Sequence, residues 1–273
     1  MEIKLIALDL DGTALQNDHK SVSDRTKQAI KSAIARNIPV IPASGRIYTV
    51  LPSAITSISG IDSAVTSNGS VIYSLKNQKS VCSSCIPAGD ALWILNRLPP
   101  QIWVEIWRHG KIYVAGEQLF RSSEYPLHPF HVEVLRKIGT DAGNLISFVS
   151  GIPGGIEKIN LPLIPASIKP KLWRLLSENS KFSLVDTGAG IEIMHSNVSK
   201  AFGLQSLCRR FLKIRMENVL AIGDSENDIE MLQACGVGVA MGNACDCVKQ
   251  AANDVTLSND RDGAARAIEK YAL

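Results

Sequence analysis

The chain has 273 residues, of which 45% are hydrophobic and 20% charged, a composition typical of globular proteins and a length that suits two unequal domains. The formal net charge of +3 is too small to indicate nucleic acid or an anionic membrane as a partner. No apolar run approaches the roughly 18 residues of a transmembrane helix, and residues 3–8 are too short for a signal peptide, so we expect a cytoplasmic protein.

The first part of the chain alternates between predicted strands and helices. Residues 3–10 form a continuous apolar run, which is typical of a strand buried on both faces. Residues 21–34 begin with helix-capping side chains and continue with apolar residues at helical spacing. Further strands are predicted at residues 38–43 and, as a returning pair, at 63–74. This order predicts an α/β fold with a parallel sheet covered by helices.

The composition changes between residues 85 and 189, which are richer in proline and aromatic residues and hold all four tryptophans. We expect this segment to be a second, α+β domain inserted into the first, whose two parts are residues 1–84 and 190–273. Within the insertion we predict helices at 90–98, 132–138 and 170–176, a hairpin of strands 102–107 and 111–115, and strands at 155–160 and 182–186.

The first pattern resumes after the insertion. We predict strands at residues 219–222 and 236–241 and helices at 200–212, 229–235, 245–252 and 262–271.

Polar side chains follow several of the predicted strands. Asp9 and Asp11 come at the end of the first strand, Ser44-Gly45 follows the second, and the sequence Gly-Asp-Ser-Glu-Asn-Asp at 223–228 follows a late one. Lys200 begins the helix before that late strand. Ligands of open α/β sheets bind at the carboxyl ends of the strands, so we expect these side chains to meet.

Such a meeting would bring together up to four carboxylates, those of Asp9, Asp11, Asp224 and Asp228. Like charges at that density repel unless a cation neutralises them, and a set of oxygen ligands with room for water suits Mg²⁺. A neighbouring hydroxyl and lysine fit the oxygens of a phosphoryl group. One carboxylate can then act as the nucleophile and another as the proton shuttle.

The segment Asp9-Leu10-Asp11-Gly12-Thr13 resembles the first motif of the haloacid dehalogenase superfamily of phosphohydrolases. Ser44 resembles the second motif, Lys200 the third, and residues 223–228 the fourth, in the form typical of the Cof-type subfamily. That subfamily carries its cap between the second and third motifs, where we place the inserted domain. The resemblance therefore implies a Rossmann-like parallel-sheet core with an inserted α+β cap of type C2B, which determines substrate specificity.

The resemblance also implies roles for the acidic residues. Asp9 would be the nucleophile that takes the phosphoryl group and also a Mg²⁺ ligand. Asp11 would be the general acid/base and would bind the metal through its backbone carbonyl. Asp224 would be the direct carboxylate ligand, with Asp228 behind it. Arg46 stays outside this catalytic set, because we interpret it as a structural partner of a carboxylate.

A second group of motif residues would contact the substrate. The resemblance implies that Ser44, with the adjacent Gly45, and Lys200 hold the phosphoryl oxygens and balance their charge. In relatives, Asn227 often faces the substrate phosphate and the Asn68-Gly69 loop lies near the substrate.

We therefore expect a Mg²⁺-dependent phosphatase that acts on a small phosphorylated metabolite, with a sugar phosphate as the first guess, through an aspartyl-phosphate intermediate. Nucleotide, flavin and pyridoxal phosphates stay open as substrates. Two alternatives also stay open: a phosphomannomutase-like phosphotransferase, which shares the position of the cap, and a non-catalytic regulatory member of the fold. We expect a monomer or a homodimer.

The cysteines, histidines and tryptophans do not show a spacing that indicates a metal, redox or substrate-binding site. We interpret the C-x-x-C at 82–85 and the C-x-C at 245–247 as structural or incidental thiols, because a zinc site favours two matched pairs. The five histidines show no metal spacing. We expect Trp103 and Trp107 to pack in a core rather than form a substrate platform.

Overall fold

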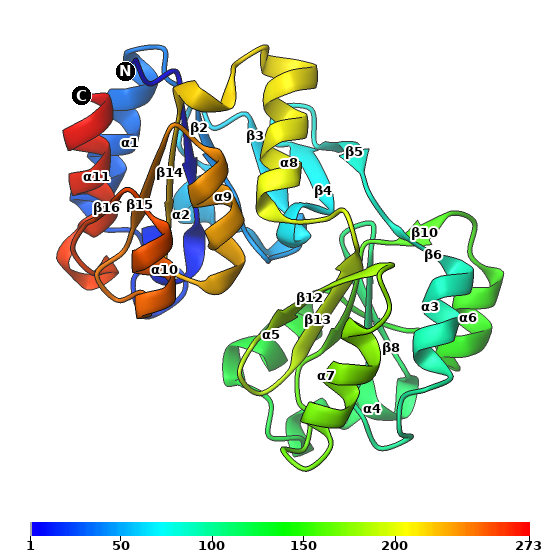
Figure 1. Ribbon diagram of the computed structural model, residues 1–273. Coiled ribbons are helices and arrows are strands. Elements are labelled where there is room, and N and C mark those ends of the chain that lie inside the picture. Colours follow the sequence, from blue (N-terminus) through cyan, green and yellow to red (C-terminus); the bar gives the residue numbers. More distant parts are fainter. Residues whose placement is uncertain (1) are drawn as a thin grey trace. The chain divides into compact units, whose positions relative to one another are not determined.

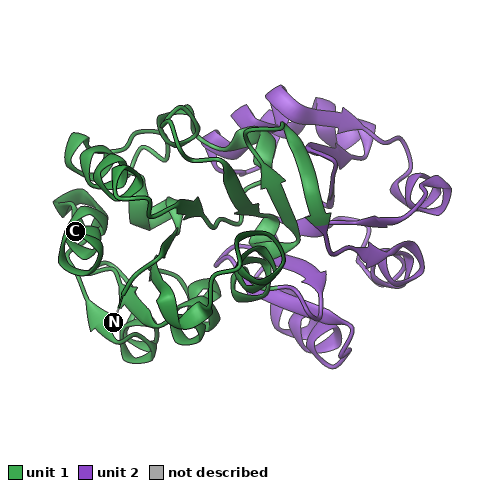
Figure 2. Cartoon of the chain, turned by 90° about the horizontal axis from the view of Figure 1, so that it is seen from above, with its two compact units in different colours: residues 1–82, 199–273 green, residues 83–198 purple. Residues whose placement is uncertain are grey.

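The computed structural model of the protein describes residues 2–273 (Figure 1). The chain forms two compact units, which Figure 2 shows in different colours. Unit 1 contains the chain up to Cys82 together with residues 199–273, and unit 2 contains Ser83–Val198. Among the described residues, no helix has the length and apolar character needed to cross a membrane.

Unit 1 is built on a five-stranded parallel sheet in the order β16-β15-β14-β1-β2. The strands are β1 (Leu5–Leu8), β2 (Val40–Pro42), β14 (Val219–Gly223), β15 (Val237–Ala240) and β16 (Asp254–Val255). A single parallel bridge from Ala43 to Val65 joins this sheet to a smaller one with the order β3-β4-β5, formed by β3 (Ser63–Thr66), β4 (Val71–Ser74) and β5 (Lys79–Ser83). The parallel α/β core predicted from the apolar runs is confirmed.

Helices cover both faces of the parallel sheet (Figure 1). Side chains alternate along β1, so Ile6 and Leu8 pack on one side with α1 and α11, while Leu5 and Ala7 pack on the other with α8, α9 and α10. The helices of unit 1 are α1 (Asp24–Ala35), α2 (Ser53–Thr56), α8 (Lys200–Leu207), α9 (Ile229–Ala234), α10 (Asp246–Ala251) and α11 (Gly263–Ala272).

Helix α1 shows how the sequence sets an element of this layer. Its N-cap is Ser23, whose hydroxyl accepts a hydrogen bond from the backbone N–H of Thr26. The buried side chains Thr26, Ala29, Ile30 and Ala33 recur at helical spacing, so one stripe of the helix faces the sheet.

Unit 2 is an α+β unit with a six-stranded sheet in the order β12-β13-β11-β7-β8-β9. All neighbouring pairs are antiparallel except β8 and β9. The strands are β7 (Glu105–Arg108), β8 (Lys111–Val114), β9 (Gly139–Asp141), β11 (Lys158–Leu161), β12 (Phe182–Asp186) and β13 (Ile191–His195), with a separate pair of β6 (Ile86–Pro87) and β10 (Gly155–Ile156). The helices are α3 (Ala88–Leu95), α4 (Gly116–Phe120), α5 (Pro129–Ile138), α6 (Leu145–Gly151) and α7 (Lys169–Ser177).

The two faces of the unit 2 sheet differ in polarity. Ile106, Ile159 and Ile193 lie on one face and pack with residues of α3, α6 and α7 in an apolar core. The alternate positions of β7 and β11 carry Glu105, Trp107, Lys158 and Asn160, all of them buried. Unit 2 therefore holds polar and charged groups inside as well as an apolar core.

Short helical turns complete both units: η1 (Leu10–Ala14), η2 (Tyr48–Val50), η3 (Ser67–Gly69), η4 (Ser122–Glu124), η5 (Cys208–Leu212), η6 (Met216–Asn218), η7 (Glu226–Asp228) and η8 (Asn259–Arg261). The turns η1, η3 and η7 follow strands β1, β3 and β14 and carry five of the ten predicted site residues: Asp11, Asn68, Gly69, Asn227 and Asp228.

The second boundary of the insertion differs from the expectation. Residues 190–198, which we predict to lie in the core, belong to unit 2. The reason is that β13 pairs with both β11 and β12 in the middle of the unit 2 sheet. The predicted strand at 155–160 divides into β10 and β11, which join different sheets.

Candidate active site

The parallel register of three strands brings the motif residues to one edge of the unit 1 sheet. Leu8, the last residue of β1, lies beside Ile222 of β14 and Pro42 of β2. The residues that follow these strands are Asp9, Asp224 and Ser44, and the backbone N–H of Asp9 donates to the Ile222 carbonyl at 3.0 Å. The convergence expected for strand ends in an α/β sheet is therefore present.

Lys200 joins two of the acids. Its Nζ lies 2.7 Å from Oδ1 of Asp9 and 2.7 Å from Oδ1 of Asp228, and all three side chains are buried. Lys200 is the first residue of α8, which begins there because the preceding Ser199 side chain accepts a hydrogen bond from the backbone N–H of Phe202. The helix start therefore fixes where this cation lies.

The carboxylates of Asp9, Asp224 and Asp228 form a compact group, called the acid cluster below. One oxygen from each lies within 4.8 Å of the others. Asp228 is held by backbone N–H donors from Asp224 and Ser225, both 3.0 Å from its Oδ2. Thr13 donates its hydroxyl to Oδ1 of Asp224 at 3.0 Å. Asp224 and Asp228 are thus each oriented by hydrogen bonds of their own, whereas Asp9 shares Lys200 with Asp228.

Burial and mutual repulsion disfavour the ionised forms of the carboxylates in the acid cluster. Burial raises the pKa of Asp9 well above its usual value, and the charge of Lys200 is not enough to offset burial together with Asp228 and Asp224. Burial and then the Asp228 charge raise the pKa of Asp224 as well. A cation among these oxygens would relieve both effects. An all-oxygen donor set is also the one that hard divalent cations prefer, so the residues present fit such an ion.

Gly12 allows the backbone to pass close to the acid cluster. Its φ of +77° lies in the left-handed region, and a Cβ added there would lie 2.3 Å from Oδ2 of Asp224. Both the conformation and the close approach therefore require glycine. Asn243, from the loop after β15, donates to the Gly12 carbonyl at 2.9 Å and lies 3.4 Å from Oδ2 of Asp224.

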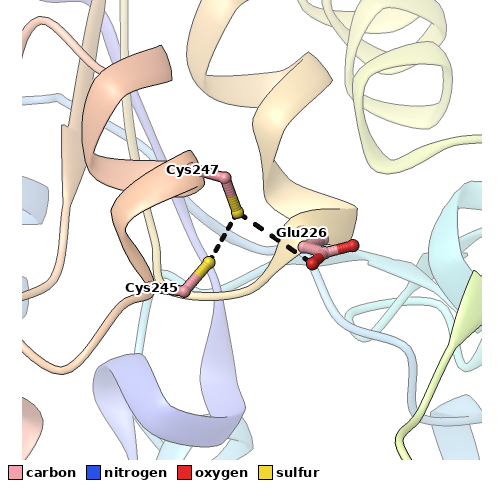
Figure 3. Close-up of side chains that lie close together, drawn as sticks. All are labelled: Glu226, Cys245 and Cys247. Carbon is pink, nitrogen blue, oxygen red and sulfur yellow. Dashed lines mark hydrogen bonds between the residues drawn. The ribbon is translucent and has the colours of Figure 1, made fainter.

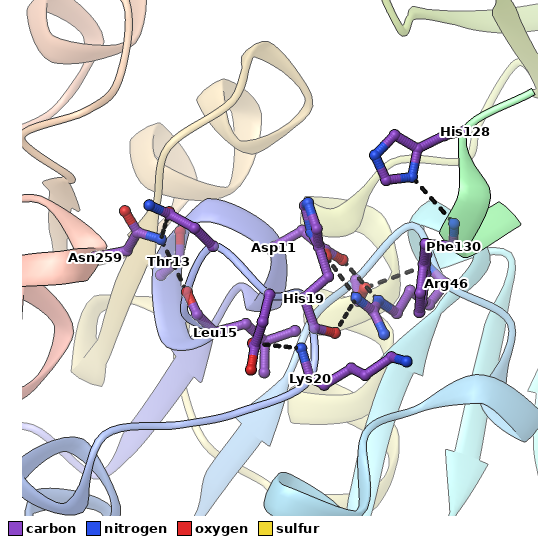
Figure 4. Close-up of polar contacts among 12 residues, drawn as sticks. Asp11, Thr13, Leu15, His19, Lys20, Arg46, His128, Phe130 and Asn259 are labelled. Carbon is purple, nitrogen blue, oxygen red and sulfur yellow. Dashed lines mark hydrogen bonds and ion pairs between the residues drawn. The ribbon is translucent and has the colours of Figure 1, made fainter.

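Asp11 lies in a different set of contacts, shown in Figure 4. Nε and Nη2 of Arg46 donate to its two carboxylate oxygens at 2.7 and 2.6 Å, and Nδ1 of His19 lies 2.9 Å from Oδ1. Burial pushes the pKa of Asp11 up, but the hydrogen bonds and charge of Arg46, together with His19, outweigh it and hold that pKa below its usual value. Arg46 thus pairs with a carboxylate as expected, and the carboxylate is that of Asp11.

The predicted substrate-binding residues form a hydrogen-bonded group next to β2 and β3. The Ser44 carbonyl accepts from the backbone N–H of Asn68 at 3.1 Å, and Asn227 donates to the Asn68 side-chain oxygen at 3.1 Å. A Cβ on Gly45 would lie 2.9 Å from that same oxygen. Gly69 has a φ of +98°, and a Cβ there would lie 2.0 Å from the Ser199 carbonyl, next to Lys200.

The sequence reasoning missed three residues that hold the site: Thr13, His19 and Asn243. Thr13 belongs to the first motif but received no role of its own. Asn243 follows β15, so the rule about strand ends could have found it. His19 gave no such signal, because it lies in a loop and has a φ of +57°.

Comparisons with known proteins identify the family of the chain. Residues 6–268 match the family of haloacid dehalogenase-like hydrolases. The 5-amino-6-(5-phospho-D-ribitylamino)uracil phosphatase YcsE of Bacillus subtilis (strain 168) is 30% identical over 283 residues, which cover 100% of this chain and 97% of that protein. A phosphoglycolate phosphatase of Methanobrevibacter smithii is 26% identical, with 100% of both chains covered.

Solved structures show the same fold. A haloacid dehalogenase-like hydrolase from B. subtilis superposes with a TM-score of 0.79 at 28% identity and covers 98% of this chain and 99% of its own. The subclass IIB sugar phosphatase BT4131 gives a TM-score of 0.79 at 21% identity, covering 98% of each chain, a likeness of fold alone. With the family match spanning nearly all of its length, the chain belongs to the haloacid dehalogenase-like hydrolases.

Proposed function

We propose that this protein is a Mg²⁺-dependent phosphatase that hydrolyses a small phosphorylated metabolite through a phosphoryl group carried on Asp9. The observation that supports this most directly is the pairing of the buried Asp9 carboxylate with Lys200, 2.7 Å away, inside the acid cluster. A carboxylate, a fixed cation and further acids at one strand end provide a nucleophile, charge balance and a cation site together.

Asp9 carries out the covalent step. Its carboxylate oxygen forms a bond to the substrate phosphorus while the bond from phosphorus to the leaving oxygen breaks, which leaves an acyl phosphate on Asp9. Water then attacks the phosphorus, the bond to Asp9 breaks, and inorganic phosphate leaves. Lys200 supplies a positive charge beside the group in both steps.

Asp11 moves the protons. It gives a proton to the leaving oxygen in the first step and takes one from the attacking water in the second. The Arg46 pair favours the ionised form, which the second step requires. A negatively charged substrate phosphate beside Asp11 favours the protonated form that the first step requires, because like charges raise a carboxyl pKa.

The acid cluster is the proposed place for Mg²⁺, with Asp9 and Asp224 as carboxylate ligands, Asp228 behind them and the Asp11 backbone carbonyl as a further ligand. When bound, the ion would neutralise charge on the phosphoryl oxygens and on the carboxylates. Ser44, Gly45, Asn68, Gly69 and Asn227 are proposed to hold the phosphoryl group and the adjoining part of the substrate.

For the substrate we propose a phosphate ester of a sugar or sugar-like alcohol. Two relatives are named for the substrates they act on, 5-amino-6-(5-phospho-D-ribitylamino)uracil and phosphoglycolate, and both are small phosphate monoesters. A panel of about a hundred phosphorylated metabolites, assayed with Mg²⁺ for released phosphate, identifies the class. If a hexose 1-phosphate yields an isomerised sugar phosphate instead of free phosphate, the protein is a phosphotransferase.

The nucleophile is tested with Asp9→Asn and p-nitrophenyl phosphate. We expect turnover to fall to background, while Asp24→Asn, which changes an exposed carboxylate in the first turn of α1, keeps wild-type turnover. Protein quenched in acid during turnover should carry phosphate that hydroxylamine releases, as expected of an acyl phosphate. Retained turnover in Asp9→Asn would refute the assignment.

The cation is tested separately by chelation. Removal of divalent ions with EDTA should abolish activity, and Mg²⁺ should restore it. Asp224→Asn should require far more Mg²⁺ for half-maximal activity, because it loses a charged ligand.

A further inference from the structure

A second group of side chains that could hold a metal ion is formed by Glu226, Cys245 and Cys247, and its chemistry differs from that of the acid cluster (Figure 3). Sγ of Cys245 and Sγ of Cys247 are 2.6 Å apart, and Sγ of Cys247 lies 4.0 Å from Oε1 of Glu226. One ligand atom from each of the three lies within 4.8 Å of the others, and all three residues are exposed. Both cysteines are free thiols.

The start of α10 explains why the two thiols meet. Residues two apart inside a helix point away from each other, because each residue turns by about 100°. Cys245, however, is the N-cap of α10, with an extended backbone at φ −69° and ψ 163°. Its side chain therefore turns back toward Cys247 instead of continuing the helical spiral, as Figure 3 shows. Glu226 comes from η7, a separate turn packed against α10.

The donor types select a class of ion. Thiolates are soft ligands that bind Zn²⁺ and similar ions, whereas the acid cluster offers only oxygen and suits hard cations. Two thiolates on one tetrahedral Zn²⁺ lie about 3.8 Å apart, and a thiolate and a carboxylate oxygen about 3.6 Å, since Zn–S is about 2.3 Å and Zn–O about 2.1 Å. Small rotations of exposed side chains reach this geometry from the observed one.

We propose that Cys245, Cys247 and Glu226 form a second metal site, separate from the acid cluster, that binds a thiophilic divalent ion such as Zn²⁺ or Cd²⁺, with water completing the coordination. The hydrogen bond between the two thiols lowers the pKa of Cys245 and raises the pKa of Cys247, so binding of the ion to both sulfurs must release the proton of each thiol. Only two protein thiolates and one carboxylate take part, so the site leaves a position open to solvent.

The test uses the full-length, reduced protein with Mg²⁺ in excess, so that the acid cluster is not available to the added ion. Titration with Cd²⁺ is followed by the ultraviolet thiolate-to-cadmium charge-transfer band, and Zn²⁺ is followed by equilibrium dialysis. We expect one ion per chain. Cys245→Ser and Cys247→Ser should each weaken binding by at least about tenfold and diminish the band, because each removes a ligand.

Three further variants separate this site from the alternatives. Glu226→Gln should keep the band but weaken binding, because the two thiolates remain. The double variant Cys82→Ser/Cys85→Ser removes the other closely spaced cysteines and should bind like wild type. Asp224→Asn should also bind like wild type, because the acid cluster takes no part.

Two results would overturn the proposal. The first is a Cd²⁺ band of wild-type size and affinity in Cys245→Ser. The second is a reduced wild-type protein that binds neither ion more tightly than Cys245→Ser does, although both thiols react with a thiol reagent. In that second case, loss of two reactive thiols on treatment with an oxidised small-molecule disulfide, in wild type but not in Cys245→Ser, would identify a redox pair in place of a metal site.

Discussion

Replacing Glu105 by glutamine should destabilise unit 2 by several kcal/mol, although the two side chains have nearly the same shape. Glu105 is fully buried and accepts four hydrogen bonds. Oε1 accepts from Nε1 of Trp103 at 3.0 Å and lies 2.6 Å from Nε2 of His131. Oε2 accepts from Nε1 of Trp107 at 3.0 Å and from Nδ2 of Asn160 at 2.8 Å. Every acceptor position of the carboxylate is therefore in use.

A glutamine keeps only one of these two oxygens, so two of the four donors would face an NH₂ group in either orientation. A buried donor left without its acceptor costs about 1–3 kcal/mol, so the two together cost about 2–6 kcal/mol of unfolding free energy. The loss should also depend on pH. Burial alone would raise the pKa of Glu105 and lower that of His131, but their mutual attraction reverses both, so Glu105 titrates below and His131 above its ordinary value.

The directions of the two pKa shifts define the pH range in which the pair of Glu105 and His131 stabilises the fold. A lowered Glu105 pKa stabilises the fold above its unfolded value of 4.5, and this is lost as pH falls through the folded value. A raised His131 pKa stabilises the fold below its unfolded value of 6.5, and this is lost as pH rises through the folded value. Both contributions are fully present between pH 4.5 and pH 6.5. The cost of Glu105→Gln in unfolding free energy should therefore be greatest in this range and should decrease at lower and at higher pH.

Urea unfolding followed by tryptophan fluorescence measures this cost, because all four tryptophans lie in unit 2. Glu133→Gln, which changes an exposed carboxylate on the same helix as His131, is the matched control and should stay within about 0.5 kcal/mol of wild type. A loss below about 1 kcal/mol in Glu105→Gln, equal at pH 5.5 and pH 8, would refute the reasoning about satisfied buried donors.

Three further changes give expected outcomes. Lys200→Met should lower kcat/KM by about 10²–10³-fold, because it removes the cation 2.7 Å from Asp9; steady-state kinetics with unchanged circular dichroism would check it. Gly12→Ala should raise the Mg²⁺ concentration for half-maximal activity by about tenfold or more, because its Cβ would displace Asp224; an unchanged Mg²⁺ requirement would contradict this. Burial raises the pKa of Glu157 to about 7, so the ionised form of this side chain destabilises the fold at high pH. Glu157→Gln should therefore stabilise unit 2 by up to about 3 kcal/mol at pH 8 and by under about 1 kcal/mol near pH 4.5, as measured by urea unfolding.

The core of the fold and the position of the site were predictable because both depend on short-range patterns. A continuous apolar run such as Leu5–Leu8 marks a strand buried on both faces. Parallel strands end at one edge of a sheet, so the residue types after Leu8 and Gly223 could be assigned to one place before any contact was known. The inserted unit was predictable from its composition, but its second boundary was not. Strand β13 is recognisable as a strand from its alternation, yet only its pairing with β11 and β12 places it in unit 2.

Specific partners could not be predicted, because they depend on register and side-chain direction. Nothing in the sequence couples Thr13 to Asp224, 211 residues away, or Arg46 to Asp11. The C-x-C motif shows the same limit in another form. Its spacing alone does not indicate a pair of metal ligands, because two side chains two residues apart in a helix point in different directions. The two thiols come together because Cys245 has an extended backbone at the start of α10.

Glu105 shows most clearly what alternation along a strand cannot determine. In β7 the pattern Glu-Ile-Trp-Arg indicates that Glu105 and Trp107 share one face and Ile106 the other, and the structure agrees. A glutamate on the polar face of an antiparallel strand ordinarily faces water. Here that face is covered, so Glu105 and Lys158 are both fully buried. The charges are tolerated because each has partners: Glu105 has its four donors, and Lys158 has Glu192 at 2.5 Å and the Trp107 ring at 3.6 Å. Burial of the second face depends on tertiary packing, which the period of a strand does not encode, and for this reason we expect an apparent surface glutamate to be important for the stability of unit 2.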